Sequence, residues 1–237
     1  MKTKIQRATE RGNVNFGWLN SNHSFSFGHW HDPTKMNFGA LRVLNDDVVS
    51  GGQGFGAHAH DNMEIISIPL KGSLAHKDST GTDGIIKTGD VQIMSAGSGI
   101  KHSEFNASET EEVNFLQVWI VPKERNIKPR YEQKTFDVED RKNKWQIVVS
   151  PDEKDEGVWI NQDAVFSLTD TDEGLAFSYQ LKCNGSGLYL FVLEGSVEVN
   201  GEQLNKRDAV EIIGDDNIEI KAKSTSQLLA IEVPLKI

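Results

Sequence analysis

One short pattern recurs in the two halves of the chain, and this repeat constrains the fold more than any other feature. Residues 69–74 (PLKGSL) match residues 192–197 (VLEGSV), and residues 87–93 (KTGDVQI) resemble residues 206–212 (KRDAVEI). Each half therefore has an apolar run, a turn at glycine, a hairpin and an acidic turn before another apolar run. We predict two related domains joined by the polar residues 121–144.

Strand-like apolar runs dominate the sequence, whereas helical periodicity is weak. The pair Asn200-Gly201 between two alternating runs is a strong hairpin signal. The 21 glycines and 6 prolines suit many strands joined by tight turns. The pattern predicts an all-β fold, either a sandwich or a barrel. The predicted strands occupy residues 39–44, 64–70, 90–94, 114–121, 145–149, 187–193, 217–220 and 227–233.

Charge and cysteine content exclude several classes of protein. The net charge of -10 argues against nucleic acid or an anionic membrane as a partner, because binding phosphate needs concentrated positive charge. The single cysteine, Cys183, allows no intrachain disulfide and fits a reducing compartment; we expect it to be a small buried residue. The N-terminus lacks the apolar run of a signal peptide. We predict a soluble cytoplasmic protein.

Two alternating pairs of polar residues are the strongest functional signal. His58 and His60 are two residues apart, as are His102 and Glu104. Residues two apart on a β-strand point to the same face. Two neighbouring strands could therefore aim three imidazoles and one carboxylate at a single metal ion, and this ligand set suits Fe, Mn, Co, Ni, Cu or Zn. The alternative is that the histidines lie on two exposed strands without a metal.

The internal repeat tests whether both halves carry this site. When Gly72 is aligned with Gly195 and Asp90 with Asp208, none of the four ligand positions has the same residue type in the second half. No histidine follows His102. We therefore predict a second domain of the same architecture without metal. The residues aligned with His58, His60, His102 and Glu104 are Leu181, Cys183, Ile220 and Ala222.

The remaining histidines receive structural interpretations. His76 follows the turn at Gly72 and is expected to be structural or exposed. His29 and His31 flank a tryptophan in a polar loop, and His23 precedes them. Any of these three could line the mouth of a pocket, but the sequence favours a structural or exposed position for each.

The residues around the two pairs resemble a known family. The spacing of the first pair with Gly52, Glu64 and Gly72 resembles the first cupin motif, and that of the second with Gly89, Gly97 and Asn106 resembles the second. More narrowly, residues 89–104 (GDVQIMSAGSGIKHSE) closely resemble the signature stretch of the pirin family. Further similar stretches lie at residues 25–28 (FSFG), 41–47 (LRVLNDD) and 129–133 (PRYEQ).

The resemblance implies a bicupin, with two tandem β-barrel or jelly-roll domains packed together. Residues 1–130 would form the metal-binding domain, and residues 131–237 a degenerate domain without metal ligands. The ligands of pirins correspond here to His58, His60, His102 and Glu104. The residue at the position of a ligand in many other cupins, Glu64, is not among these four. We expect it either to support a metal-bound imidazole or pocket or to lie on the surface of a strand. Ser95 stands where many cupins have proline, a change expected to affect local turn rigidity more than the chemistry.

The resemblance also implies an activity. Bacterial pirin relatives resemble quercetin 2,3-dioxygenases, which open the central ring of a flavonol and release carbon monoxide. The expected ion is Fe(II), with Cu, Mn, Co, Ni or Zn as alternatives, and Glu104 would act as general base. The expected partners are an aromatic flavonol-like substrate and O2, and the expected state is a monomer.

Two other functions stay open from the sequence. Eukaryotic pirins resemble metal-dependent regulatory proteins that bind protein partners. A cupin can also serve as an enzyme for another small enolisable substrate, because the fold does not determine the function.

Overall fold

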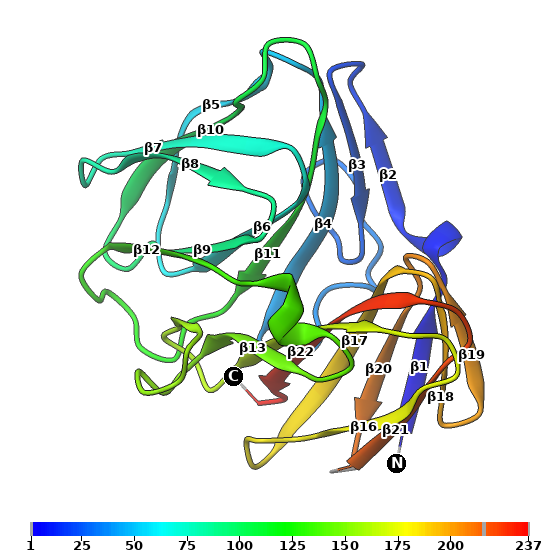
Figure 1. Ribbon diagram of the computed structural model, residues 1–237. Helices are drawn as coiled ribbons and strands as arrows, with labels where there is room; N and C mark the ends of the chain where they lie inside the picture. The colour runs from blue at the N-terminus through cyan, green and yellow to red at the C-terminus, as the bar shows by residue number, and fades with distance from the viewer. Residues whose placement is uncertain (1, 215–216, 237) are drawn as a thin grey trace. The chain divides into compact units, whose positions relative to one another are not determined.

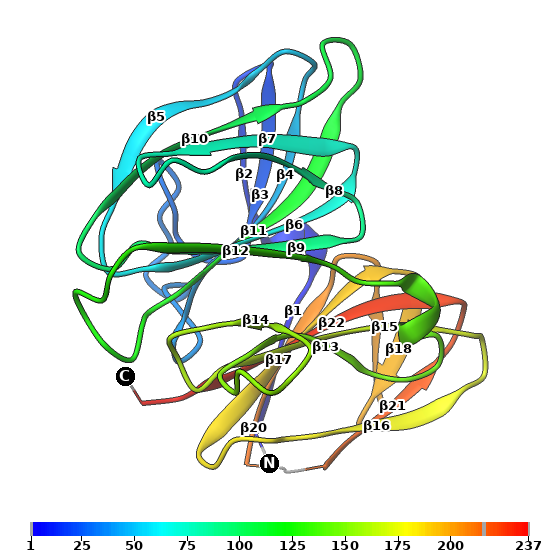
Figure 2. The same cartoon turned by 60° about the vertical axis from the view of Figure 1, so that its left-hand side comes forward.

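The computed structural model of the chain describes residues 2–214 and 217–236 and consists of β-strands (Figures 1 and 2). Among those residues there is no α-helix. The two short 3-10 helices are η1 (Ala8–Glu10) and η2 (Val138–Arg141). No helix in this described part of the chain is long and apolar enough to cross a membrane. The predicted all-β class is confirmed.

The chain forms two compact units, and each unit includes a segment from the other half of the sequence. The N-terminal unit comprises Gly12–Phe136 and Val158–Gln162. The C-terminal unit comprises residues 1–11, 137–157 and 163–237. The boundary predicted at residue 130 stays a prediction.

The N-terminal unit contains two antiparallel sheets. The larger has the strand order β12-β9-β6-β11-β4-β3-β2, and the smaller has the order β5-β10-β7-β8. The short β14 (Val158–Trp159) belongs to this unit. The other strands are β2 (Gly12–Asn15), β3 (Leu19–His23), β4 (Leu41–Val49), β5 (Gly54–His60), β6 (Glu64–Lys71), β7 (Ser73–Asp78), β8 (Asp83–Lys87), β9 (Asp90–Ser95), β10 (Ile100–Asn106), β11 (Val113–Ile120) and β12 (Arg130–Thr135).

The C-terminal unit repeats this plan, which explains the sequence repeat. Within the unit the larger sheet runs β1-β20-β17-β22-β15-β13, and the smaller runs β16-β21-β18-β19. The first strand of the chain, β1, pairs with β20. The strands are β1 (Lys2–Gln6), β13 (Gln146–Ser150), β15 (Val165–Thr171), β16 (Ala176–Gln180), β17 (Ser186–Glu194), β18 (Ser196–Val199), β19 (Glu202–Asn205), β20 (Ala209–Ile213), β21 (Asn217–Ala222) and β22 (Ser226–Pro234).

Turn residues with positive φ separate the repeated strands. Gly72 (φ 78°) lies between β6 and β7, and Gly195 (φ 81°) occupies the same place between β17 and β18. Asn200 (φ 49°) and Gly201 (φ 85°) join β18 to β19. Two consecutive residues with positive φ are typical of a type I′ hairpin turn. The hairpin predicted at Asn200-Gly201 is confirmed.

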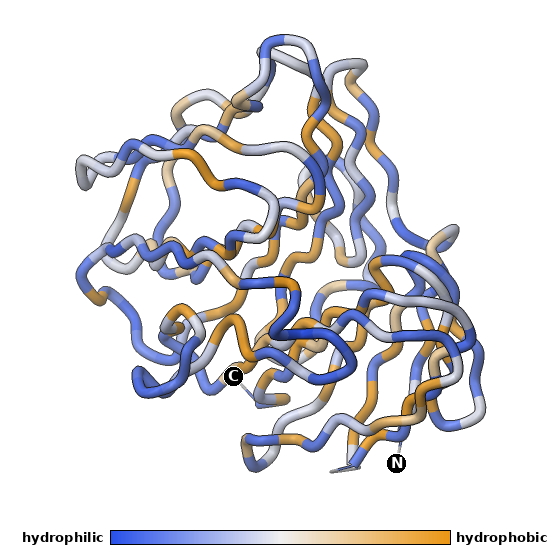
Figure 3. Tube along the Cα trace, in the orientation of Figure 1, coloured by the Kyte–Doolittle hydropathy of each residue, from blue (hydrophilic) through white to orange (hydrophobic). Residues whose placement is uncertain are grey.

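Burial along the strands divides them into two kinds. On β10 every second residue is buried, from Ile100 through His102 and Glu104 to Asn106. By contrast, β9 is buried at every position and β6 at six of its eight, so both faces of these strands are covered. Orange stretches in Figure 3 lie mainly along the strands, while most loops are blue or white. The alternating strand β10 carries the pair His102 and Glu104, whereas His58 and His60 lie on β5, which is partly exposed.

A close approach of β5 to β10 generates a prediction about glycine. A Cβ atom at Gly54 would lie 2.4 Å from the carbonyl oxygen of Glu104 and 2.4 Å from Cα of Phe105, both backbone atoms. At Gly56, on the same strand, a Cβ would meet no atom within 4 Å. We expect Gly54→Ala to lower the free energy of unfolding by about 1–3 kcal/mol because the strands must separate.

Gly56→Ala is the matched control, and its effect should stay within about 0.5 kcal/mol. Urea denaturation followed by circular dichroism measures both variants. Equal stability of the two variants would contradict the close approach at Gly54.

Candidate metal centre

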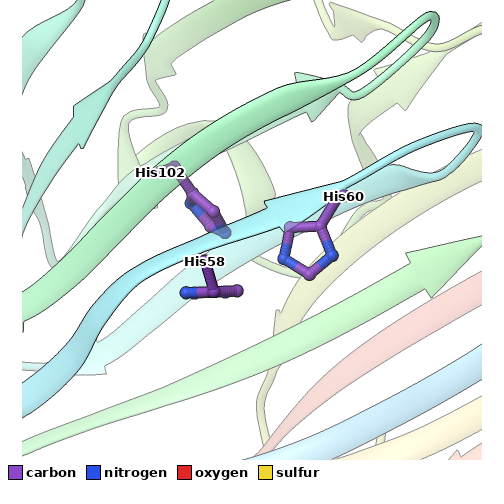
Figure 4. A group of neighbouring side chains, drawn as sticks. All are labelled: His58, His60 and His102. Atoms are coloured by element: carbon purple, nitrogen blue, oxygen red, sulfur yellow. The ribbon is translucent and has the colours of Figure 1, made fainter.

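Three histidines converge between two neighbouring strands. In the antiparallel ladder of β5 and β10, His58 lies opposite His102 and His60 opposite Ile100. The ring centroids are 4.4 Å apart for His58 and His102, 4.7 Å for His58 and His60, and 4.9 Å for His60 and His102. The ligand nitrogens all lie within 4.8 Å of one another. Figure 4 shows the two β5 imidazoles beside that of β10.

The hydrogen bonds of these imidazoles leave nitrogen lone pairs free for a metal. Nδ1 of His58 lies 2.8 Å from the carbonyl oxygen of Gly56. A carbonyl only accepts, so Nδ1 carries the proton and Nε2 keeps its lone pair. His102 is 3% exposed, and neither ring nitrogen has a hydrogen-bond partner among the described residues. A buried polar group without a partner is costly, and a metal ion would remove that cost at His102.

Electrostatics keep two of the imidazoles neutral. Burial, and then the neighbouring His58, lower the pKa of His60 to about 4. Burial, with His58 and His60 next to it, lowers the pKa of His102 to about 3. Because only the neutral ring binds a metal, both side chains are ready for coordination at neutral pH.

An irregularity in the ladder lies between His102 and Glu104. Two steps along β10 face three steps along β5, so Glu104 pairs with Phe55. This is the pattern of a β-bulge, which redirects side chains next to functional sites. Phe55 packs against the apolar cluster that contains Leu74 and Phe115. Glu104 therefore lies at the boundary between the histidines and the apolar interior of the unit.

Glu104 is buried and firmly held. It is 2% exposed. Ser67 donates to its Oε1 at 3.0 Å, and Nε2 of Gln117 donates to its Oε2 at 2.8 Å. Burial raises the pKa of Glu104, and the nearby His76 is the largest influence that opposes this rise. The ligand atoms of Glu104, His76 and His102 all lie within 4.8 Å of one another, so the Glu104 carboxylate belongs to this second group and not to the three-histidine group. The four predicted residues thus fall into two overlapping groups.

His76 is a member of the site that the sequence interpretation missed. The sequence favoured a structural or exposed position, and the burial of His76, which is 1% exposed, rules out the exposed one. It lies directly opposite Glu104 in the β7–β10 ladder. The signal that could have found it is its alternation with Asp78, because His76 Nε2 lies 3.0 Å from Asp78 Oδ2. Burial alone would raise the pKa of Asp78, but hydrogen bonds from Thr80 and His76 outweigh burial and lower it.

Glu64 is neither a surface carboxylate nor a neighbour of the histidines. It is fully buried, and burial raises its pKa. Its Oε2 accepts from Ser95 Oγ at 2.7 Å and from the Asn161 backbone nitrogen at 3.2 Å. The surface interpretation is wrong, and no described contact joins Glu64 to a predicted ligand. Ser95 does more than alter turn rigidity, because its hydroxyl binds this buried carboxylate.

The other singled-out side chains lie elsewhere. His23 is 4% exposed and its ring contacts Phe27 at a centroid distance of 5.5 Å, so it is structural. His29 and His31 lie in the exposed loop after it. Cys183 is half-buried rather than buried, which corrects the prediction. Burial and the neighbouring Glu232 raise the pKa of its thiol to about 11.

The ladders of the C-terminal unit correct the internal alignment by two residues. Glu104 pairs with the residue four positions after Gly72, and Ile220 pairs with the residue four positions after Gly195. Glu104 therefore corresponds to Ile220, not to Ala222. A shift of two preserves the strand face, so the absence of ligand types at these positions is unaffected. The residues at the places of His58, His60, His76, His102 and Glu104 are Tyr179, Leu181, Val199, Ile218 and Ile220.

Comparison with known proteins assigns both units. The family model described as Pirin matches residues 3–120, and the one described as Quercetinase C-terminal cupin domain matches residues 147–233. The quercetin 2,3-dioxygenase of Escherichia coli K12 is 41% identical over 233 residues, which cover 97% of this chain and 98% of that protein. A pirin-like protein of Caulobacter vibrioides is 39% identical over 222 residues, covering 93% of this chain and 95% of its own length.

A solved structure agrees over the whole chain. The crystal structure of a bacterial pirin from Escherichia coli in complex with nickel(II) has a TM-score of 0.93 and 39% sequence identity, and covers 100% of both chains. The prediction of two cupin-type domains is confirmed.

The low pKa values predict a weak pH dependence of metal binding. Protons compete with a metal ion at His60 and His102 only near pH 4 and pH 3. Three imidazoles with an ordinary pKa of about 6.5 would lose about 500-fold in affinity from pH 6 to pH 5. We expect a loss below about 100-fold, measured by competition titration with Ni(II) at the two pH values. A loss near the full value would contradict the lowered pKa values.

Proposed function

The chain belongs to the pirin family, and from that membership we propose that it is a metal-dependent dioxygenase that cleaves the central ring of flavonols. In this reaction both atoms of O2 enter the products as one ring carbon leaves as carbon monoxide. The observation that carries the proposal is the convergence of three imidazoles, of which His58 and His102 keep a nitrogen lone pair free for a metal. The 41% identity to a quercetin 2,3-dioxygenase over nearly the full length supports the choice of substrate class.

The donor set fits one divalent transition-metal ion. We propose that His58, His60 and His102 hold it, with Glu104 as the fourth ligand beside His102. Neutral imidazole nitrogens and a carboxylate suit borderline divalent ions. We propose Fe(II) as the ion, with Mn, Co, Ni, Cu and Zn as alternatives. The nickel(II) in the related bacterial pirin supports a site for a first-row divalent ion.

Glu104 is proposed to accept the proton of the flavonol 3-hydroxyl group. A bound ion of this class would supply Lewis acidity that lowers the pKa of the flavonol 3-hydroxyl group, and redox chemistry toward O2. Burial raises the pKa of Glu104, and a base works best when its pKa approaches the working pH. Ser67 and Gln117 each donate to one carboxylate oxygen and so fix its orientation.

Aromatic side chains beside His60 provide a wall for a planar substrate. The Trp119 ring lies 4.9 Å from the His60 ring and 5.2 Å from the Phe27 ring, edge to face in both cases. Trp119 and Phe27 are half-buried, so part of each ring can contact a ligand. We propose that the flavonol rings lie against this pair, because binding sites for small molecules are mostly apolar with a few placed polar groups.

Oxygen-dependent loss of quercetin tests the function. We expect the metal-loaded protein to remove the long-wavelength flavonol absorption band in air, with release of carbon monoxide. The same protein under argon and the chelated protein in air should both leave the band unchanged. Persistence of the band in air with one ion bound per chain would overturn the proposal. The predicted monomer and cytoplasmic location stay predictions.

Glu104 variants test the proposed base separately from metal binding. We expect Glu104→Ala to lower kcat by at least 100-fold, which is the usual contribution of a general base. Metal affinity should fall much less, because the three imidazoles remain. Glu104→Gln keeps the shape of the side chain and should lose activity to the same extent. Isothermal titration with Ni(II) and the quercetin assay give the two readouts; equal losses in both would contradict the base role.

A further inference from the structure

A second group of potential metal ligands lies next to the three histidines. His76, His102 and Glu104 are all buried, and their ligand atoms lie within 4.8 Å of one another. His76 faces Glu104 directly across the β7–β10 ladder. The His76 ring centroid lies 5.4 Å from that of His102. The two groups share His102, so a line of five potential ligands runs from the partly exposed His58 and His60 into the unit.

The hydrogen bonds of His76 prepare Nδ1 as a ligand atom. Nε2 lies 3.0 Å from Asp78 Oδ2. A carboxylate only accepts, so Nε2 carries the proton and the lone pair of the neutral ring lies on Nδ1. The other oxygen of Asp78 is held at 2.8 Å by the Thr80 backbone nitrogen and at 2.6 Å by the Thr80 hydroxyl. A carboxylate fixed behind a histidine is the usual support of a metal-bound imidazole.

The Nδ1 atom of His76 is also buried without a partner among the described residues. The side chain is 1% exposed. The Tyr131 ring, 4.8 Å away between centroids, packs beside the imidazole, and its hydroxyl instead donates to Gln133. Buried polar atoms are rarely left unpaired, and a metal ion would satisfy Nδ1 of His76.

We propose that His76, His102 and Glu104 form an inner metal position, which takes the same class of divalent transition-metal ion as the three-histidine position. Because both positions use His102 and Glu104, the unit holds one ion at a time, bound either with His58 and His60 or with His76. His76 is then a metal ligand of this chain. The inference rests on the proposed metal chemistry, but its test measures binding alone and needs no turnover.

Removing the outer histidines isolates the inner position. We expect His58→Ala/His60→Ala to bind one Co(II) per chain, at least tenfold more weakly than the wild-type protein. Adding His76→Ala should weaken binding at least tenfold further and change the visible absorption of bound Co(II). The matched control adds His31→Ala instead, which replaces an exposed loop histidine and should change neither readout. His58 and His60 are partly exposed, so their loss leaves the apolar core intact.

Several results would overturn the inference. One is a folded double variant, checked by circular dichroism, that binds no Co(II) while the wild-type protein binds one ion. Another is that His76→Ala behaves like His31→Ala, which would place the residual ion elsewhere. If the alanine pair unfolds, His58→Asn/His60→Asn replaces it with polar side chains on β5. Asp78→Asn in the double variant should also weaken binding, because an amide no longer fixes the His76 tautomer.

These outcomes separate the inference from the proposed function. A wild-type protein that cleaves quercetin while the double variant binds no ion refutes the inner position and leaves the dioxygenase proposal standing. A double variant that binds Co(II) through His76, in a protein without quercetin turnover, supports the inner position and refutes the dioxygenase proposal.

Discussion

The antiparallel pairing of β5 with β10 is the constraint on which the site depends. It places His58 opposite His102, and strand alternation then brings His60 to the same side. The pairing requires that β5 approach backbone atoms of β10 at Gly54, where no side chain fits. Because a shift of β5 by one residue would turn His58 and His60 to the opposite face, this register determines whether their imidazoles can meet that of His102.

Hydrogen bonds from polar side chains on the strands fix the orientation of the Glu104 carboxylate and the His76 imidazole. Ser67 on β6 and Gln117 on β11 lie opposite each other and both bind Glu104. On the other side of β10, Asp78 supports His76 from within the same strand, β7. Glu104 therefore takes its orientation from neighbouring strands, whereas His76 takes its orientation from its own strand. This arrangement gives a rigid cluster on sheets, where side chains are placed more accurately than on loops.

The sequence predicted what depends on strand periodicity and missed what depends on pairing between strands. Alternation was enough to select His58, His60, His102 and Glu104, and the repeat was enough to predict two β-units. The alternation of His76 with Asp78 was a signal in the sequence, but the pairing of His76 with Glu104 depends on the β7–β10 register, which the sequence does not contain. The surface alternative for Glu64 was wrong because both faces of β6 are buried, so alternation along this strand carries no information about exposure. The bulge after His102 has no sequence signal beyond nearby glycines.

The exchange of segments between the two units has a consequence for synthesis on the ribosome. β1 is made first, but its partner β20 begins about 200 residues later. At about 5–20 residues per second, synthesis takes roughly 10–40 s to reach β20, and β1 has no strand to pair with during that time. Likewise, the buried Glu64 receives the Asn161 backbone donor only after the chain has passed its middle. Neither unit can be complete before synthesis of the other has begun. Until their partners are made, the β1 strand and the Glu64 carboxylate must therefore not pair with other segments of the nascent chain.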